Sequence, residues 1–78
     1  MGTHDMLMLM KIAVENNDTS EKTLTQIKDF LKLDAKLSVV KLPIRKLAMA
    51  TLELLGVEFY SSDEELRYAK EILKFERN

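Results

Sequence analysis

Apolar residues recur at helical spacing in three segments of the chain. In the clearest one, between Pro43 and Gly56, they follow the i, i+3, i+4, i+7 pattern of one buried helix face. They are Ile44, Leu47, Ala48, Thr51, Leu52 and Leu55. Proline is common at the first position of a helix and glycine just after the last. The pattern therefore predicts a helix over residues 43–55 that ends at a left-handed glycine.

Two further segments show the same period. The first spans residues 19–33, and Asp18 with Glu21 three positions later resembles a capping box at its start. The second begins at a capping box of Ser62 and Glu65 and continues toward the end of the chain. Both segments have apolar residues on one side and charged residues on the other, which predicts amphipathic helices that pack on a common core.

Three stretches between the helices are rich in β-branched, aromatic or apolar residues. Residues 36–42 and 57–60 are short and read as strands, and the apolar run 6–14 is typical of a strand that is buried on both faces. Strands that alternate with helices imply a parallel sheet with right-handed crossovers. We therefore predict a small three-layer βαβαβα domain of the α/β class. Its three-stranded parallel sheet has the order 2-1-3, with Ile12 and Val14 in the core.

An all-α four-helix bundle is the alternative fold. Methionine and leucine, which dominate the run from Met6 to Met10, are good helix formers, and a short apolar run fits a buried helix as well as a buried strand. In this alternative the segment from Met6 to Asn16 is the first helix of the bundle.

Composition limits the class of protein. With 78 residues, 46% of them hydrophobic, and a formal net charge of −1, the chain is expected to form one soluble domain over residues 6–78. Residues 1–5 are expected to be a disordered or vector-derived N-terminus. The chain lacks cysteine, which suits the reducing cytoplasm. Its longest apolar run is far shorter than the roughly 20 residues that cross a bilayer, so no membrane is expected.

A parallel sheet of this order would gather two loops at a topological switch point. These possible switch-point loops are Asn16, Asn17 and Asp18, and Ser61, Ser62 and Asp63. Neither contains glycine and both precede acidic helix starts, which argues against phosphate binding. Helix capping already explains Asp18 and Asp63, so a divalent cation is a weak hypothesis. We predict no cofactor and no metal.

One basic segment stands out, because residues 35–52 contain four cations and no acid. The four cations are Lys36, Lys41, Arg45 and Lys46. Arg45 and Lys46 lie in the first turn of a predicted helix, where the helix dipole disfavours positive charge, so an anion or nucleic-acid phosphate is one candidate for their contacts. The simpler interpretation is that lysines protect an edge strand from pairing with other chains. Phe59 and Tyr60 are neighbours in one strand, so at most one of them is expected to be exposed.

No catalytic constellation is visible in the sequence. The single histidine, His4, lies near the N-terminus, and no Gly-x-Ser-x-Gly motif surrounds Ser61 or Ser62. The leading hypothesis is a small non-enzymatic interaction module that self-associates or docks on a larger protein. The alternative is a binder of nucleic acid or another anionic ligand through residues 36–46. An enzyme that uses Asp18, Asp63 and a metal is a third, weaker reading.

Overall fold

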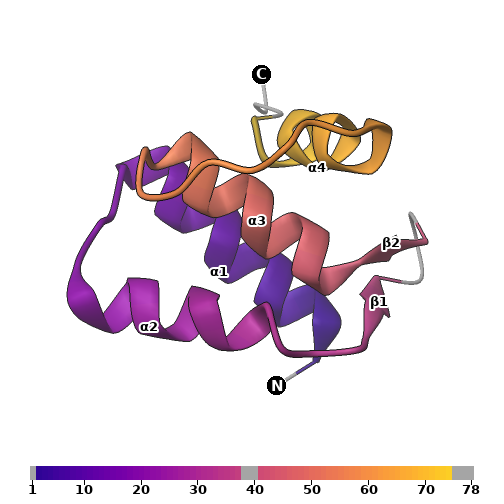
Figure 1. Ribbon diagram of the computed structural model, residues 1–78. Helices are drawn as coiled ribbons and strands as arrows, with labels where there is room; N and C mark the ends of the chain where they lie inside the picture. The colour runs from indigo at the N-terminus through magenta and orange to yellow at the C-terminus, as the bar shows by residue number, and fades with distance from the viewer. Residues whose placement is uncertain (1, 38–40, 75–78) are drawn as a thin grey trace.

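The computed structural model describes residues 2–37 and 41–74 and shows a mainly helical protein. In chain order its elements are α1 (Thr3–Asn16), α2 (Glu21–Phe30), β1 (Lys36–Leu37), β2 (Leu42–Pro43), α3 (Ile44–Leu54) and α4 (Glu64–Lys74). Helix α3 lies at the centre, with α1 behind it and with α2 and α4 on opposite sides (Figure 1). The predicted α/β domain is therefore wrong, and the four-helix alternative has the correct class.

Helix α3 supplies the centre of the hydrophobic core. Five of its side chains are completely inaccessible to solvent: Ile44, Leu47, Ala48, Ala50 and Leu52. Thr51 is also fully buried, and its hydroxyl donates a hydrogen bond of 2.7 Å to the carbonyl oxygen of Leu47, so no polar group is left unsatisfied there. The predicted apolar face of this helix is confirmed.

The strand predicted for residues 6–14 is wrong, because these residues form most of α1. Exposure follows a helical period: Met10 and Ala13 are buried, whereas Ile12 is 51% exposed. The helix ends at Asn17, which has a φ of 50°. The amide N–H groups of Asn17 and Asp18 donate to the carbonyl oxygens of Val14 and Ala13, which is the Schellman arrangement. Ile12 is therefore a surface residue and not part of the core.

The two other predicted strands are also corrected. Within the described residues the only sheet is a two-stranded antiparallel hairpin, in which Lys36 pairs with Pro43 and Leu37 with Leu42. The predicted strand 36–42 thus contains a reversal, where Lys41 has a φ of 56°; residues 38–40 lie outside the described residues. Residues 57–60 form a loop. Without a parallel sheet there is no strand order 2-1-3 and no topological switch point.

The helix ends show where the capping predictions hold and where they shift. Gly56 has the predicted left-handed conformation, with a φ of 76°, and the N–H of Val57 donates to the carbonyl of Leu52 at 2.9 Å. Helix α2 is capped by Ser20, two residues after the predicted Asp18. Helix α4 is capped by Asp63, whose Oδ1 accepts the N–H of Leu66 at 2.7 Å, in place of the predicted Ser62.

Helices α3 and α4 run in the same direction, because the loop between them returns along the molecule (Figure 1). Lys46 in the first turn of α3 pairs with Asp63 just before α4, and Glu53 near the end of α3 pairs with Lys70 in the second half of α4. On each helix segment the paired residues are seven positions, or about two helical turns, apart. The two ion pairs therefore hold α4 in a fixed register on α3.

Candidate interaction site

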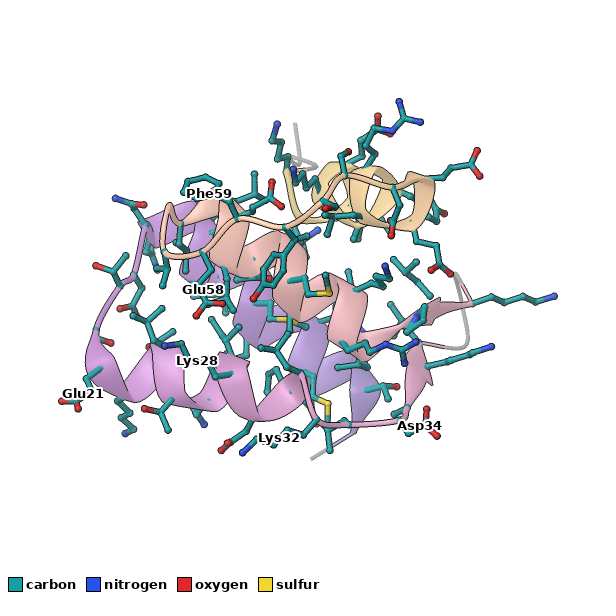
Figure 2. All side chains as sticks on the ribbon, in the orientation of Figure 1. Glu21, Lys28, Lys32, Asp34, Glu58 and Phe59 are labelled. Carbon is teal, nitrogen blue, oxygen red and sulfur yellow. The ribbon has the colours of Figure 1, made fainter. Side chains whose placement is uncertain are left out.

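The loop between α3 and α4 presents a phenylalanine to solvent. Phe59 is 77% exposed, the highest exposure of any large hydrophobic residue in the described ranges 2–37 and 41–74. In Figure 2 its label lies at the end of the molecule where α3 ends, away from the hairpin. Isolated exposed apolar residues are ordinary on protein surfaces. Phe59 is unusual because polar contacts hold the residues on either side of it in place.

Glu58 fixes the loop on one side of Phe59. Its Oε1 accepts a hydrogen bond of 2.6 Å from the hydroxyl of Tyr60, and its Oε2 lies 3.8 Å from Nζ of Lys28 on α2. Figure 2 shows Lys28 and Glu58 facing each other across the space between α2 and the loop. The Glu58 carboxylate thus links the loop to α2.

Glu53 fixes the loop from the side of α3. Its Oε2 accepts the backbone N–H of Tyr60 at 3.1 Å, and its Oε1 accepts a hydrogen bond from Nζ of Lys70 on α4. The Glu53 side chain is only 12% exposed. The hydrogen bond from Lys70 holds the pKa of Glu53 below its ordinary value against the opposing effect of burial, so this carboxylate stays ionised at neutral pH.

Tyr60 points inward where Phe59 points outward. It is half-buried and packs against the hydrophobic core. Burial, together with the hydrogen bond to Glu58, raises the pKa of the Tyr60 hydroxyl to about 12. The hydroxyl is therefore a neutral donor at physiological pH. The prediction that at most one of these two neighbouring aromatic residues is exposed agrees with this arrangement, although a loop and not a strand produces it.

A shallow groove of about 310 Å³ lies between α1 and the start of α2. It is lined by three apolar side chains of α1, one polar side chain of the α1–α2 connection and one of the first turn of α2: Leu9, Ile12, Ala13, Asp18 and Thr23. Ile12, one of the most exposed large apolar residues described, forms part of its wall. The groove is thus an apolar surface with one carboxylate at its border.

The Asp18 carboxylate is already satisfied by its own chain. Oδ1 accepts the backbone N–H of Ser20 at 3.0 Å, and Oδ2 accepts the hydroxyl of Thr23 at 2.8 Å. The hydrogen bonds from Ser20, and then the one from Thr23, hold the pKa of Asp18 below its ordinary value. Asp18 therefore acts as a structural anion at the start of α2, and no metal is needed to explain it.

Two of the four cations of the predicted basic segment are close to carboxylates of the same chain. Lys46 donates to Asp63, which lowers the pKa of that carboxyl, and Arg45 Nη1 lies 3.9 Å from Oδ1 of Asp34. Lys36 and Lys41 are exposed on the hairpin. Two of the four cations thus contact carboxylates of the same chain, and Lys46 is explained by helix packing.

The two predicted switch-point loops are not brought together. Asn16 is the last residue of α1, and Asn17 and Asp18 begin the connection to α2. Ser61, Ser62 and Asp63 precede α4, at the opposite end of the molecule beside the hairpin (Figure 1). Asp18 and Asp63 therefore cannot share one metal ion. In the part of the chain that the structure describes, no group of three or more potential metal-ligating side chains is present.

Comparison with protein-family models, curated proteins and solved structures gives no match for this chain. Among the described helices, none is both long and apolar enough to cross a membrane. The residues themselves are therefore the basis for any functional proposal. Sequence patterns missed the groove because it depends on the helical form of α1. They missed the ordered loop around Phe59 because Lys28, which pairs with Glu58, is distant in the sequence, and because the bond from the Tyr60 N–H to Glu53 forms only when the chain turns back after α3.

Proposed function

We propose that this protein is a small non-enzymatic interaction module, one that self-associates or docks on another protein through Phe59. The observation that carries the proposal is a 77% exposed phenylalanine on a loop anchored at both neighbouring residues. Burial of an aromatic side chain removes about 150–250 Å² of surface from water. A loop that is already ordered loses less conformational entropy on binding than a mobile one.

The charges around Phe59 also favour an apolar contact. Glu58 is paired with Lys28, and Glu53 is paired with Lys70. A partner does not need to supply compensating charges for these carboxylates. Binding through Phe59 is therefore expected to depend on the aromatic ring more than on salt concentration. The chain has no cysteine, so we place the module in the reducing cytoplasm.

A photoreactive phenylalanine analogue at position 59 tests this proposal. We expect irradiation of cells that make this variant to give one prominent covalent adduct, because the ring at this position lies in an interface. The same analogue at Tyr68, a residue of α4 that is 47% exposed, is the matched control and should give little adduct. Equal adduct patterns from positions 59 and 68 would contradict the proposal. Mass spectrometry of the adduct identifies the partner as a second copy or another protein.

Nucleic-acid binding through the hairpin is the second candidate function. Lys36 and Lys41 are exposed, and the Arg45 side chain is 48% exposed in spite of its contact with Asp34. These three residues lie on or directly beside the β1–β2 hairpin at one end of the molecule (Figure 1). Lys46 is occupied by Asp63, so at most three cations of the basic segment contribute.

Salt titration distinguishes this candidate. If Lys36, Lys41 and Arg45 each meet one phosphate, the slope of log K against log salt should be about −2 to −3 for duplex DNA. Joint replacement of Lys36 and Lys41 by glutamate should abolish binding, whereas Phe59→Ala should leave it unchanged. Lack of detectable binding to duplex or single strands at low salt excludes the nucleic-acid function.

A further inference from the structure

The Glu53 carboxylate joins α4 to the loop that presents Phe59. Its Oε1 accepts a hydrogen bond from Nζ of Lys70, and its Oε2 accepts the backbone N–H of Tyr60 at 3.1 Å. Each oxygen thus has a partner from a different segment of the chain. Contacts at both oxygens limit the rotation of the carboxylate, so a change at one partner is passed to the other.

The packing of α4 determines where Lys70 lies. Leu66 and Ala69 are completely inaccessible to solvent and Leu73 is buried, and α4 uses this face to pack against α3 and α1. Lys70 follows Ala69 directly and lies four residues after Leu66, at the border of the packed face. Its ammonium group therefore reaches Glu53 only while α4 is docked on α3.

The loop depends on Glu53 beyond the end of α3. The N–H groups of Val57 and Glu58 donate to one carbonyl oxygen of α3, at 2.9 and 3.4 Å. Among the described residues, the next hydrogen bond made by the loop backbone is the one from the Tyr60 N–H to Glu53. Phe59 lies between these two attachments. The second attachment therefore decides whether the backbone at Phe59 is held on both sides.

Lys70 keeps the Glu53 carboxylate in place by compensating its charge. The Glu53 side chain is largely covered, and an ionised carboxylate away from water is unfavourable unless it is paired. The hydrogen bond from Lys70 lowers the pKa of Glu53, whereas burial acts in the opposite direction. Without Lys70 the charged carboxylate gains by turning toward water. Such a turn removes the acceptor of the Tyr60 N–H.

We propose that α4 controls the order of the Phe59 loop, and that Lys70 is the positioning residue through which it does so. The inference rests on the proposed interaction function and adds a means of regulating it. While α4 is docked, Lys70 holds Glu53 against Tyr60 and the loop presents Phe59 in a fixed position. Displacement of α4, or loss of the Lys70 charge, releases the loop. Because coupling between two sites is reciprocal, a partner that holds Phe59 also favours docked α4.

Hydrogen exchange of two variants tests the coupling. Lys70→Met removes the ammonium group and keeps a flexible aliphatic side chain. We expect the Tyr60 amide to lose at least about tenfold more protection than the amides of α4 in this variant. Lys46→Met is the matched control, because it breaks the other α3–α4 ion pair, with Asp63. In the control, Tyr60 should lose no more protection than α4 itself, since the loop is released only when α4 leaves.

Two further variants separate a positioning role of Lys70 from a merely structural one. Lys70→Arg keeps the positive charge and should retain most of the protection of the Tyr60 amide. The double variant Glu53→Gln/Lys70→Met has no unpaired carboxylate, and glutamine can still accept the Tyr60 N–H. It should regain the protection that Lys70→Met loses, although it has no ion pair at this position. Circular dichroism checks the fold, and refolding of an unfolded Lys70→Met by Glu53→Gln would be the same rescue.

The inference is wrong if Tyr60 in Lys70→Met loses no more protection than α4, or if the double variant shows no recovery. These measurements need no partner, so they judge the coupling separately from binding. The photoreactive analogue at position 59 tests the consequence for binding: its adduct should decrease in Lys70→Met and return in Lys70→Arg. An unchanged adduct in Lys70→Met would overturn the regulatory role. Absence of an adduct from position 59 in the otherwise wild-type chain contradicts the interaction function and leaves the coupling measured by exchange in place.

Discussion

We expect Leu47→Ala to lower the free energy of unfolding by about 2–5 kcal/mol, the usual cost of removing a buried leucine side chain. Leu47 is completely inaccessible to solvent and lies on α3, which packs against each of the other three helices. The cavity left by the substitution cannot be filled by one neighbour alone, because helices pack on several sides of α3. Urea unfolding followed by far-UV circular dichroism measures the change.

Ile12→Ala is the matched control for Leu47→Ala. Both substitutions shorten an aliphatic residue of a helix, but Ile12 is 51% exposed. We expect the control to change stability by no more than about 0.5 kcal/mol, as is usual for surface sites. Equal losses from the two substitutions would contradict the helical α1 and would return Ile12 to the buried position that the strand prediction gave it.

The three amphipathic helices could be predicted because local signals agree in each of them. Apolar residues at helical spacing mark each helix. A capping side chain adds to this signal at the start of α2 and of α4, and a proline at the start and a glycine at the end add to it in α3. The capping residues themselves were misplaced by one or two positions. Ser20 and Asp63 compete with neighbouring Asp18 and Ser62 for the same free N–H groups, and only the three-dimensional geometry selects between them.

Helix α1 could not be predicted from its pattern, because apolar residues occupy positions on all of its sides. A continuous apolar run is consistent with a buried strand and with a buried helix. Asn17 was the usable signal: asparagine is one of the few non-glycine residues that ends a helix in the left-handed conformation, as it does here with a φ of 50°. With its neighbours Asn16 and Asp18, Asn17 fits equally well a turn after a strand, which is why the apolar run alone predicts the wrong element.

The basic segment shows why charge patterns alone misplace a site. Lys46 and its partner Asp63 are 17 residues apart, as are Glu53 and Lys70. These pairs form because α3 and α4 run in the same direction, an arrangement that local patterns do not reveal. A lysine in the first turn of a helix is disfavoured by the helix dipole, but the ion pair with Asp63 offsets this cost for Lys46. The same packing places Glu53 under Tyr60 and so creates the ordered loop that presents Phe59.

Glu53→Ala is expected to loosen this loop and so to weaken the proposed binding through Phe59, although Phe59 itself is unchanged. The substitution removes the acceptor for the Tyr60 N–H and leaves Lys70, whose side chain is 24% exposed, without its carboxylate. Loss of such partners costs about 1–3 kcal/mol. Hydrogen exchange should show faster exchange at the Tyr60 amide, and the photoreactive analogue at position 59 should give less adduct.

Glu53→Gln separates the two roles of this side chain. Glutamine keeps an oxygen that can accept the Tyr60 N–H but loses the charge that pairs with Lys70. We expect it to retain slow exchange at Tyr60 and most of the adduct from position 59, and to lose stability through the α3–α4 contact alone. In Glu53→Ala we expect protection of the Tyr60 amide from exchange and binding through Phe59 to decline together. An unanchored loop must lose more conformational entropy when Phe59 is buried. Fast exchange at Tyr60 combined with an unchanged adduct from position 59 would show that Phe59 acts without a fixed loop.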